Sequence, residues 1–447
     1  MSAIGRGAQT DPILRVLDFL TLDTGAEDVR WPVARRVAGI AWRYGSSAAG
    51  PVSIAGAHFI AALIFLHGLS RIEFGLFSFL LVVVPFCMSI TGSLVGAPLS
   101  NGMTRSAQID ESQLSTFFKM NIVTACIATA VVFAMMLSAG APPVVAVLLG
   151  VYGGVMVVRW FARCFAYVGH NPFRAVSSDF LYSGALVVTL LSLVLLHKLT
   201  MGAASVALLA CAGLSLPAFG MAYLRKQIRP GSSGSIAAYL PIWRDLTRWS
   251  ALGVLLTELT ANAHAYLVTF ISGPSSFALL ALGSLVMRPV SLVFSALPDM
   301  ERPIMGRAIA AGNSAAAFRT VNEFRTATSA VWAATLLLAG VLLTWFPHLL
   351  LKKGYDETQV IAVIAIWSAI MLVRAIRTPE NVFLQAAGEY QGLARASMRS
   401  SVVSLALTLV LLFAFGPIAS LCGILGGDIT MTLGIFALTK AWKARHA

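Results

Sequence analysis

The stretch that decides the fold is FGLFSFLLVVVPFCMSITGSLVGAPL, residues 74–99, which contains no charged side chain. A helix rises about 1.5 Å per residue, so this stretch is long enough to cross a hydrocarbon core of roughly 30 Å. It lacks the alternation of polar and apolar residues that a transmembrane strand requires. We therefore predict a membrane-spanning α-helix, because lipid offers no partners for backbone N–H and C=O groups.

The composition of the whole chain agrees with this prediction. Its 447 residues are 58% hydrophobic and include only 32 Lys+Arg and 19 Asp+Glu. A soluble protein of this length would carry roughly 110 charged residues. The sequence therefore excludes a soluble enzyme, a disordered chain and a DNA-binding domain, and it predicts an all-α polytopic membrane protein. The net charge of +13 comes from small basic groups between apolar segments, so no nucleic-acid partner is expected.

Other apolar stretches resemble residues 74–99 in length, and together they predict about 12 transmembrane helices. Half of them precede a long polar segment in the middle of the chain, and half follow it. The predicted spans are 48–68, 74–99, 117–139, 143–168, 176–196, 201–223, 249–271, 276–299, 326–346, 358–376, 398–415 and 418–439.

Basic residues fall mostly on one side of the predicted membrane. With the amino terminus inside, 27 of the 32 Lys and Arg lie on the inner side. Inner loops accumulate positive charge, so this distribution predicts that both termini are cytoplasmic. Arg288 lies within a span and belongs to neither side. The outer basic residues are Arg71, Lys198, Lys352 and Lys353.

The alternation of polar segments and groups of apolar spans divides the chain into four parts. Residues 1–47 are mostly polar and form a cytoplasmic or interfacial segment, in which 33–44 suits a helix lying in the headgroup layer. Residues 48–223 and 249–447 form two six-helix lobes. Residues 224–248 contain a cluster of Gly, Ser and Pro, and we interpret them as a cytoplasmic linker between the lobes.

Ionisable side chains inside a span are costly in lipid and turn toward a partner or a wet cavity. Four lie near mid-depth: His58, Glu258, Arg288 and Asp428. Glu258 and Arg288 lie at similar depths on consecutive spans, so we expect them within reach of each other. Two interpretations stay open: a structural ion pair, or two groups facing a central cavity where Arg288 binds an anionic substrate. Guanidinium matches phosphate oxygens well, and Pro289 can kink the span beside Arg288.

The other buried ionisable residues also allow two interpretations each. His58 can carry a proton near neutral pH, or it is a hydrogen-bonded core histidine. Asp428 lies beside two glycines and can bind a cation or accept a hydrogen bond from a neighbouring helix. His264 lies two turns from Glu258 and can share its cavity. Glu258, His58, His264 and Asp428 are therefore candidates for ion coupling or for the cavity wall.

Arginines gather toward the inner ends of two spans. Arg159 and Arg163 stand one turn apart and project from one helix face, and Arg374 and Arg377 repeat the arrangement. These groups either contact anionic lipid headgroups or form a basic vestibule that collects a phosphorylated substrate. In the second interpretation, Arg159, Arg163 and Arg374 bind substrate together with Arg288.

Motifs for catalysis and metal binding are absent from the sequence. It contains no GxxxxGK[ST] loop, GxSxG elbow or HExxH motif, and its five cysteines stand alone in apolar runs, as small hydrophobes do. We therefore expect no enzyme, no metal and no cofactor. The predicted outer connections are short, the longest having about 11 residues. That length disfavours a membrane glycan polymerase or acyltransferase, which generally needs a sizeable outer loop.

Two hairpins resemble a known family. The first, residues 67–100, has a short turn into Glu73-Phe74-Gly75-Leu76-Phe77 and a long apolar arm, and residues 262–303 repeat a polar start, a Gly turn and a long arm. This pattern resembles the Wzx-like polysaccharide flippases of the multidrug/oligosaccharidyl-lipid/polysaccharide exporter (MOP) superfamily. One departure is Asn262-Ala263-His264, where the family often has Asn-x-Asp.

The resemblance implies a V-shaped bundle of two lobes around a central cavity that opens alternately to each side. Its substrate would be an oligosaccharide on a polyprenyl pyrophosphate, flipped to the outer leaflet for lipopolysaccharide or exopolysaccharide synthesis. The implied location is a bacterial inner membrane, where glycan polymerases or glycosyltransferases are potential partners.

A cation-coupled multidrug exporter of the same superfamily is the alternative. Such a protein needs a buried carboxylate for coupling, which Glu258 or Asp428 could supply. The basic inner side of this chain favours an anionic substrate, and we therefore expect a flippase.

Overall fold

The computed structural model describes residues 31–99, 111–169, 171–231, 234–347 and 355–446. The first 30 residues, and with them most of the predicted amino-terminal segment, lie outside the described residues, as do Lys352 and Lys353. The chain forms two compact units, Met1–Ser46 and Ser47–Ala447.

The first unit contains the start of helix α2, which runs from Trp31 to Gly68. The predicted interfacial segment 33–44 falls within this helix, so its helical state is confirmed. Its position in the headgroup layer stays a prediction.

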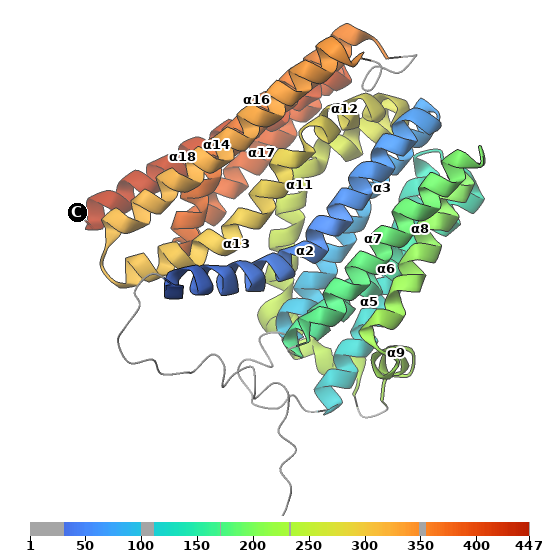
Figure 1. The fold of residues 1–447 in the computed structure, drawn as a ribbon, viewed down its shortest axis with the longest axis horizontal. Coiled ribbons are helices and arrows are strands. Elements are labelled where there is room, and N and C mark those ends of the chain that lie inside the picture. Colours follow the sequence, from blue (N-terminus) through green and yellow to red (C-terminus); the bar gives the residue numbers. More distant parts are fainter. Residues whose placement is uncertain (1–30, 100–110, 170, 232–233, 348–354, 447) are drawn as a thin grey trace, which may run out of the picture. The chain divides into compact units, whose positions relative to one another are not determined.

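The second unit is all-helical in its described residues, which confirms the predicted fold class (Figure 1). Two short π-helical segments, η1 (Gly92–Gly96) and η4 (Trp243–Thr247), interrupt the α-helices. The helices after α2 are α3 (Arg71–Thr91), α5 (Glu111–Ser138), α6 (Pro143–Val168), α7 (Pro172–Leu195), α8 (Met201–Ser215), α9 (Met221–Ile228), α10 (Leu240–Ile242), α11 (Arg248–Ser272), α12 (Pro274–Val286), α13 (Arg288–Ala310), α14 (Ser314–Trp345), α16 (Glu357–Ala386), α17 (Tyr390–Phe415) and α18 (Pro417–His446).

The number of membrane spans agrees with the prediction. Within the described residues, 10 helices are long and apolar enough to cross a membrane, and two bent pairs raise the number to 12 if each pair is one span. One pair is α12 with the start of α13, which meet at 62°. Pro289 lies at this break, so the kink predicted from the sequence is confirmed.

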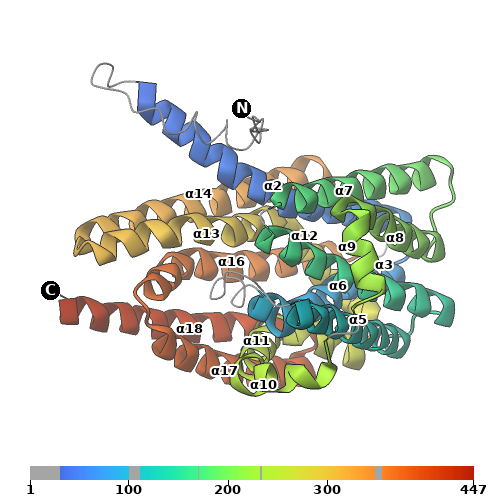
Figure 2. The same ribbon diagram turned by 90° about the horizontal axis from the view of Figure 1, so that it is seen from below.

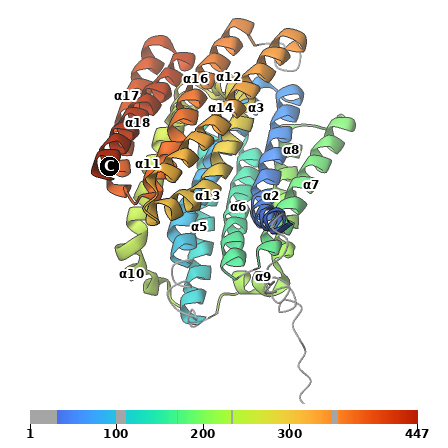
Figure 3. The same ribbon diagram turned by 60° about the vertical axis from the view of Figure 1, so that its left-hand side comes forward.

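Large apolar side chains cover the outside of the bundle. Leu337 is 72% exposed, Phe413 70% and Val144 73%. A soluble protein seldom leaves so many such side chains in water, whereas lipid tails would cover them. The long helices run next to one another, and α17 and α18 lie side by side near α16 (Figures 2 and 3). The fold is therefore that of a multi-pass membrane protein.

Helix α3 packs against helices of both halves of the chain. It packs against α5 and α6 of the first half and against α11 and α12 of the second. The EFG turn explains how: Ser70 and Glu73 form a capping box that starts α3, and Gly75 faces the backbone of Pro274 so closely that a Cβ would overlap the carbonyl. The motif seen in the sequence therefore marks a helix crossing.

The predicted linker 224–248 is more ordered than its composition suggests. It holds most of α9 together with η3 (Ile236–Tyr239), α10 and η4, and Gly231 and Gly234 contact α5. Ser115 Oγ donates to the Gly231 carbonyl at 2.5 Å, and Lys119 Nζ donates to the Gly234 carbonyl. A Cβ on Gly234 would overlap the backbone of α5. Glycine here permits close approach of two backbones rather than a loose connection.

Candidate functional site: a charged cavity between the two halves

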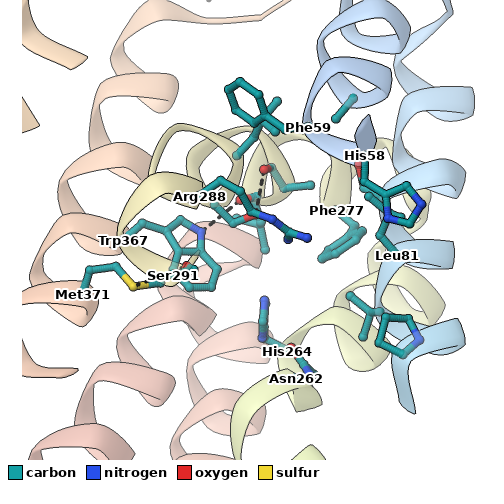
Figure 4. A pocket seen from close by; sticks show the side chains of 18 of the residues that line it. His58, Phe59, Leu81, Asn262, His264, Phe277, Arg288, Ser291, Trp367 and Met371 are labelled. Carbon is teal, nitrogen blue, oxygen red and sulfur yellow. Dashed lines mark hydrogen bonds between the residues drawn. The ribbon is translucent and has the colours of Figure 1, made fainter. Parts of the chain in front are cut away.

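A cavity of about 350 Å³ lies between the two halves of the second unit (Figure 4). Side chains from α2 and α3 line one side, and side chains from α11, α12, α13 and α16 line the other. The structure brings five of the sequence candidates to this cavity. They are His58, Glu258, His264, Arg288 and Arg374.

Arg288 is the first residue of α13, directly after the break that ends α12. The break turns the backbone, and the Arg288 side chain reaches into the cavity toward the side on which His58 lies (Figure 4). Within the described part of the chain, no carboxylate forms an ion pair with Arg288. A cavity-lining guanidinium therefore keeps its positive charge available.

Glu258 also lines the cavity, but it does not pair with Arg288. Its Oε1 accepts hydrogen bonds from Asn262 Nδ2 at 3.0 Å and from the Tyr266 hydroxyl at 2.9 Å. Both donors lie on the same helix, α11, which bends by 60° after Glu258. Of the two interpretations left open by the sequence, the geometry matches two separate groups facing one cavity.

His58 begins a hydrogen-bonded chain that leads away from the cavity. Its Nε2 and the Tyr182 hydroxyl are 2.8 Å apart, and the Tyr182 and Tyr152 hydroxyls are 2.9 Å apart. The Arg159 guanidinium lies over the Tyr182 ring, 4.6 Å from its centroid. His58 therefore lines the cavity as a hydrogen-bonded histidine, and its role as a proton carrier stays a prediction.

His264 is 3% exposed, and its ring lies 5.6 Å from the Trp367 ring, centroid to centroid. Its Nδ1 has no hydrogen-bond partner within the described part of the chain. His264 and Asn262 both appear at the cavity (Figure 4). The predicted shared cavity of His264 and Glu258 is therefore present.

Arg159 and Arg163 bind one carboxylate that sequence reasoning missed. Arg159 donates to Asp179 at 2.7 Å, and Arg163 donates to the other oxygen of Asp179 at 2.5 Å. Asp179 is fully buried on α7 and faces Gly50 of α2. A comparison of depth could have found it, because Asp179 and Arg163 lie at similar distances from the inner ends of two consecutive antiparallel spans.

Arg374 and Arg377 form a similar cluster in the second half. Arg374 Nε donates to one oxygen of Asp428 at 2.8 Å, and an Arg377 nitrogen lies 2.8 Å from the other oxygen. Asp428 thus accepts from two guanidinium groups, which take the positions that a bound cation would need. These residues line a second chamber of about 550 Å³ that shares Arg374 with the central cavity.

Among the described residues that line the central cavity there is no cysteine. Cys87 and Cys211 are buried in the main apolar core, as predicted for small hydrophobes, while Cys126 and Cys422 are exposed. Among the described residues, no group of His, Cys, Asp and Glu has the arrangement of a metal site.

No known protein family matches the sequence, and no curated protein matches it either. Solved structures do match the fold. A multidrug resistance MATE family transporter of the MOP superfamily, in an inward-facing conformation, gives a TM-score of 0.64 with 13% identity over 88% of this chain and 95% of that one. The lipid II flippase MurJ, in an inward closed conformation, gives a TM-score of 0.66 with 11% identity over 88% of this chain and 86% of that one.

A third match is a point mutant of the Vibrio cholerae MATE transporter VcmN. Its TM-score is 0.52 at 14% identity, and the match covers 92% of this chain and 97% of that one. Both MATE transporters and MurJ belong to the MOP superfamily. The chain therefore has a fold like that of these MATE transporters and of MurJ.

Proposed function

We propose that this protein flips an oligosaccharide linked to a polyprenyl pyrophosphate across the membrane by alternating access. The observation that carries the proposal is Arg288, a guanidinium that reaches into the central cavity and has no carboxylate partner in the described part of the chain. A partly buried charge of this kind is costly when alone, and an anionic substrate would neutralise it.

The other candidates have complementary roles in this proposal. Arg288 would contact the pyrophosphate through its planar pair of N–H donors. Arg374, which lines both the central cavity and the second chamber, would lie along the path of the head group. His58, Glu258 and His264 would form the remaining polar wall, in which proton or cation binding could couple to transport.

Because the substrate has a long apolar tail, the proposal requires that the cavity open sideways to the lipid at some stage of transport. A polyprenyl chain is as apolar as the bilayer and gains nothing from leaving it. Only the charged head group and its sugars therefore need the polar cavity. The fold shared with the lipid II flippase MurJ is compatible with this division.

A mutation of Arg288 tests the proposal. In cells that depend on this protein for a surface glycan, Arg288→Ala should abolish glycan export, while Arg288→Lys should retain a part, because it keeps the charge and loses the planar fork. Surface glycan is measured by immunoblot, and membrane insertion is measured on the same cells. Arg319→Ala is the control, since Arg319 pairs with Glu323 at an exposed position. Normal export by Arg288→Ala would refute the proposed role of Arg288.

One observation favours a second candidate, a cation-coupled multidrug exporter. Glu258 lines the same cavity and is held only by the neutral groups of Asn262 and Tyr266, so it could attract an organic cation. Drug susceptibility of a deletion strain separates the two. Altered susceptibility with an intact surface glycan would favour the exporter, and lost glycan with unchanged susceptibility would favour the flippase.

A further inference from the structure

A side chamber of about 270 Å³ adjoins the central cavity and is lined mainly by the first half of the chain. It lies between α2, α3 and α6 and shares His58, Leu81, Pro85 and Arg288 with the central cavity. An anion that reaches Arg288 therefore stands at the entrance of this chamber.

The charged side chains that line the side chamber are all basic. Arg159, Arg163 and Arg288 line it, and no acidic side chain does so among the described residues. Asp179 pairs with Arg159 and Arg163 from outside the lining. Asp179 thus compensates two of the three guanidinium groups in part, and an anion would balance the positive charge that remains.

Two donors in the chamber are unused. Arg163 is 6% exposed and its Nε has no hydrogen-bond partner, although another nitrogen of the same group binds Asp179. Trp160 Nε1 is also buried without a partner, and the Arg163 guanidinium lies 5.4 Å from the Trp160 ring centroid. A buried donor without an acceptor is costly, so two neighbouring ones indicate that an acceptor belongs there.

The remaining wall is apolar, with Ile54, Leu80, Val84 and Met88 among its residues. Apolar walls exclude water and strengthen a hydrogen bond between a guanidinium and an anion. The chamber in the second half differs, because Asp428 lines it beside Arg374 and Arg377. Of these two chambers, the one in the first half therefore suits an anion better.

We propose that the side chamber is a binding site for a phosphate-class anion, held by Arg163 Nε and Trp160 Nε1 with Arg288 at the entrance. The inference rests on the proposed function and deepens it, since it gives the pyrophosphate a defined resting place inside the first half. Arg159 acts as a positioning residue, because its bonds to Asp179 and Ser178 and its stacking on Tyr182 leave it fixed behind the site.

Binding of farnesyl pyrophosphate and of inorganic pyrophosphate to the purified full chain tests this site. The protein is held in nanodiscs of phosphatidylcholine, and both affinities are measured by calorimetry. Arg163→Lys keeps a charge beside Asp179 but removes Nε, and Trp160→Phe keeps a ring but removes the N–H donor. Both hydrogen bonds have an ionised acceptor, so we expect a loss of affinity of about 10-fold for Arg163→Lys and about 10-fold for Trp160→Phe.

Matched controls exist elsewhere in the chain. Arg325→Lys changes an arginine that pairs with Glu380, and Trp332→Phe removes an N–H that donates to the Ser368 carbonyl at 2.9 Å. Neither residue lines the side chamber. Both controls should bind the two probes as the wild type does, and all variants should keep the wild-type elution volume in size-exclusion chromatography.

The outcomes separate the site from the proposed function. Losses with both probes would support a site for the free anion, and losses with farnesyl pyrophosphate alone would support a site for the lipid-linked form. If Arg288→Ala weakens binding while Arg163→Lys and Trp160→Phe do not, the side-chamber site is wrong and the proposed function stands. If the wild type binds neither probe but binds an organic cation such as ethidium, both proposals are overturned.

Discussion

At the scale of residues, the charges inside the membrane fall into two kinds. Asp179 and Asp428 each hold two arginines, and these clusters tie neighbouring helices together. Arg288 and Glu258 instead line the cavity without an ion pair in the described part of the chain. Carboxylates compensate the charges of the first kind, whereas the charges of the second kind are uncompensated in that part of the chain and available to a ligand.

We predict that Asp179→Asn destabilises the protein strongly. It leaves Arg159 and Arg163 buried without a carboxylate, and breaking such a buried pair costs about 3–5 kcal/mol. Thermal unfolding in detergent should show a midpoint lowered by several degrees. Glu323→Gln breaks an exposed pair with Arg319 and should leave the midpoint nearly unchanged. Equal midpoints for the two variants would contradict the structural role of Asp179.

The sequence shows most of these residues but not their partners. Depth along a span follows from counting residues, and both residues compared in this way, Glu258 and Arg288, line the central cavity. The partner of a side chain depends on helix rotation, which hydropathy does not report. The sequence therefore did not predict that Glu258 accepts hydrogen bonds from Asn262 and Tyr266. It also did not predict the ion pair between Asp179 and Arg163.

At the scale of elements, the apolar stretches predict where helices cross but not where they end. The span predicted at 398–415 belongs to α17, which begins at Tyr390, and the span predicted at 117–139 belongs to α5, which begins at Glu111. The extra turns are polar, because a helix continues into the aqueous layer once packing holds it. Hydropathy therefore underestimates the length of helices that have polar ends.

The crossing of α3 and α12 gives a prediction at this scale. Gly75→Leu should disrupt the packing of the two helices, because Gly75 faces the Pro274 backbone with no room for a Cβ. Unfolding in detergent should occur at a lower temperature than in the wild type. Gly184→Ala on α7 has open space around the new methyl group and should be neutral or slightly stabilising. A wild-type midpoint for Gly75→Leu would show that the crossing tolerates a side chain.

The segment 224–248 between the two halves gives a second prediction at this scale. Gly234→Ala should detach the Gly-rich stretch from α5, because its methyl group would meet the Ser112 and Thr116 backbone. Limited trypsin digestion should then cut faster near Arg229 than in the wild type. Gly306→Ala has free space at α13 and serves as the control. An unchanged digestion rate for Gly234→Ala would mean that the stretch does not depend on this close contact.

At the scale of the whole molecule, the two halves meet around the central cavity but differ in charge. The side chamber of the first half is lined by arginines with no acidic residue among those described, whereas the chamber of the second half includes Asp428. The division into lobes at 48–223 and 249–447, the cytoplasmic termini and the substrate stay predictions. The likeness of the fold to a MATE transporter and to MurJ follows from the structure.

The most direct test of the central claim is translocation in proteoliposomes. A fluorescent oligosaccharide on a polyprenyl pyrophosphate is placed in both leaflets, and a membrane-impermeant enzyme that cleaves the sugar reports which molecules reach the outer leaflet. We predict that the wild type makes nearly all of the substrate accessible, and that Arg288→Ala leaves about the half that starts outside. Full accessibility with Arg288→Ala, or no movement with the wild type, would contradict the claim.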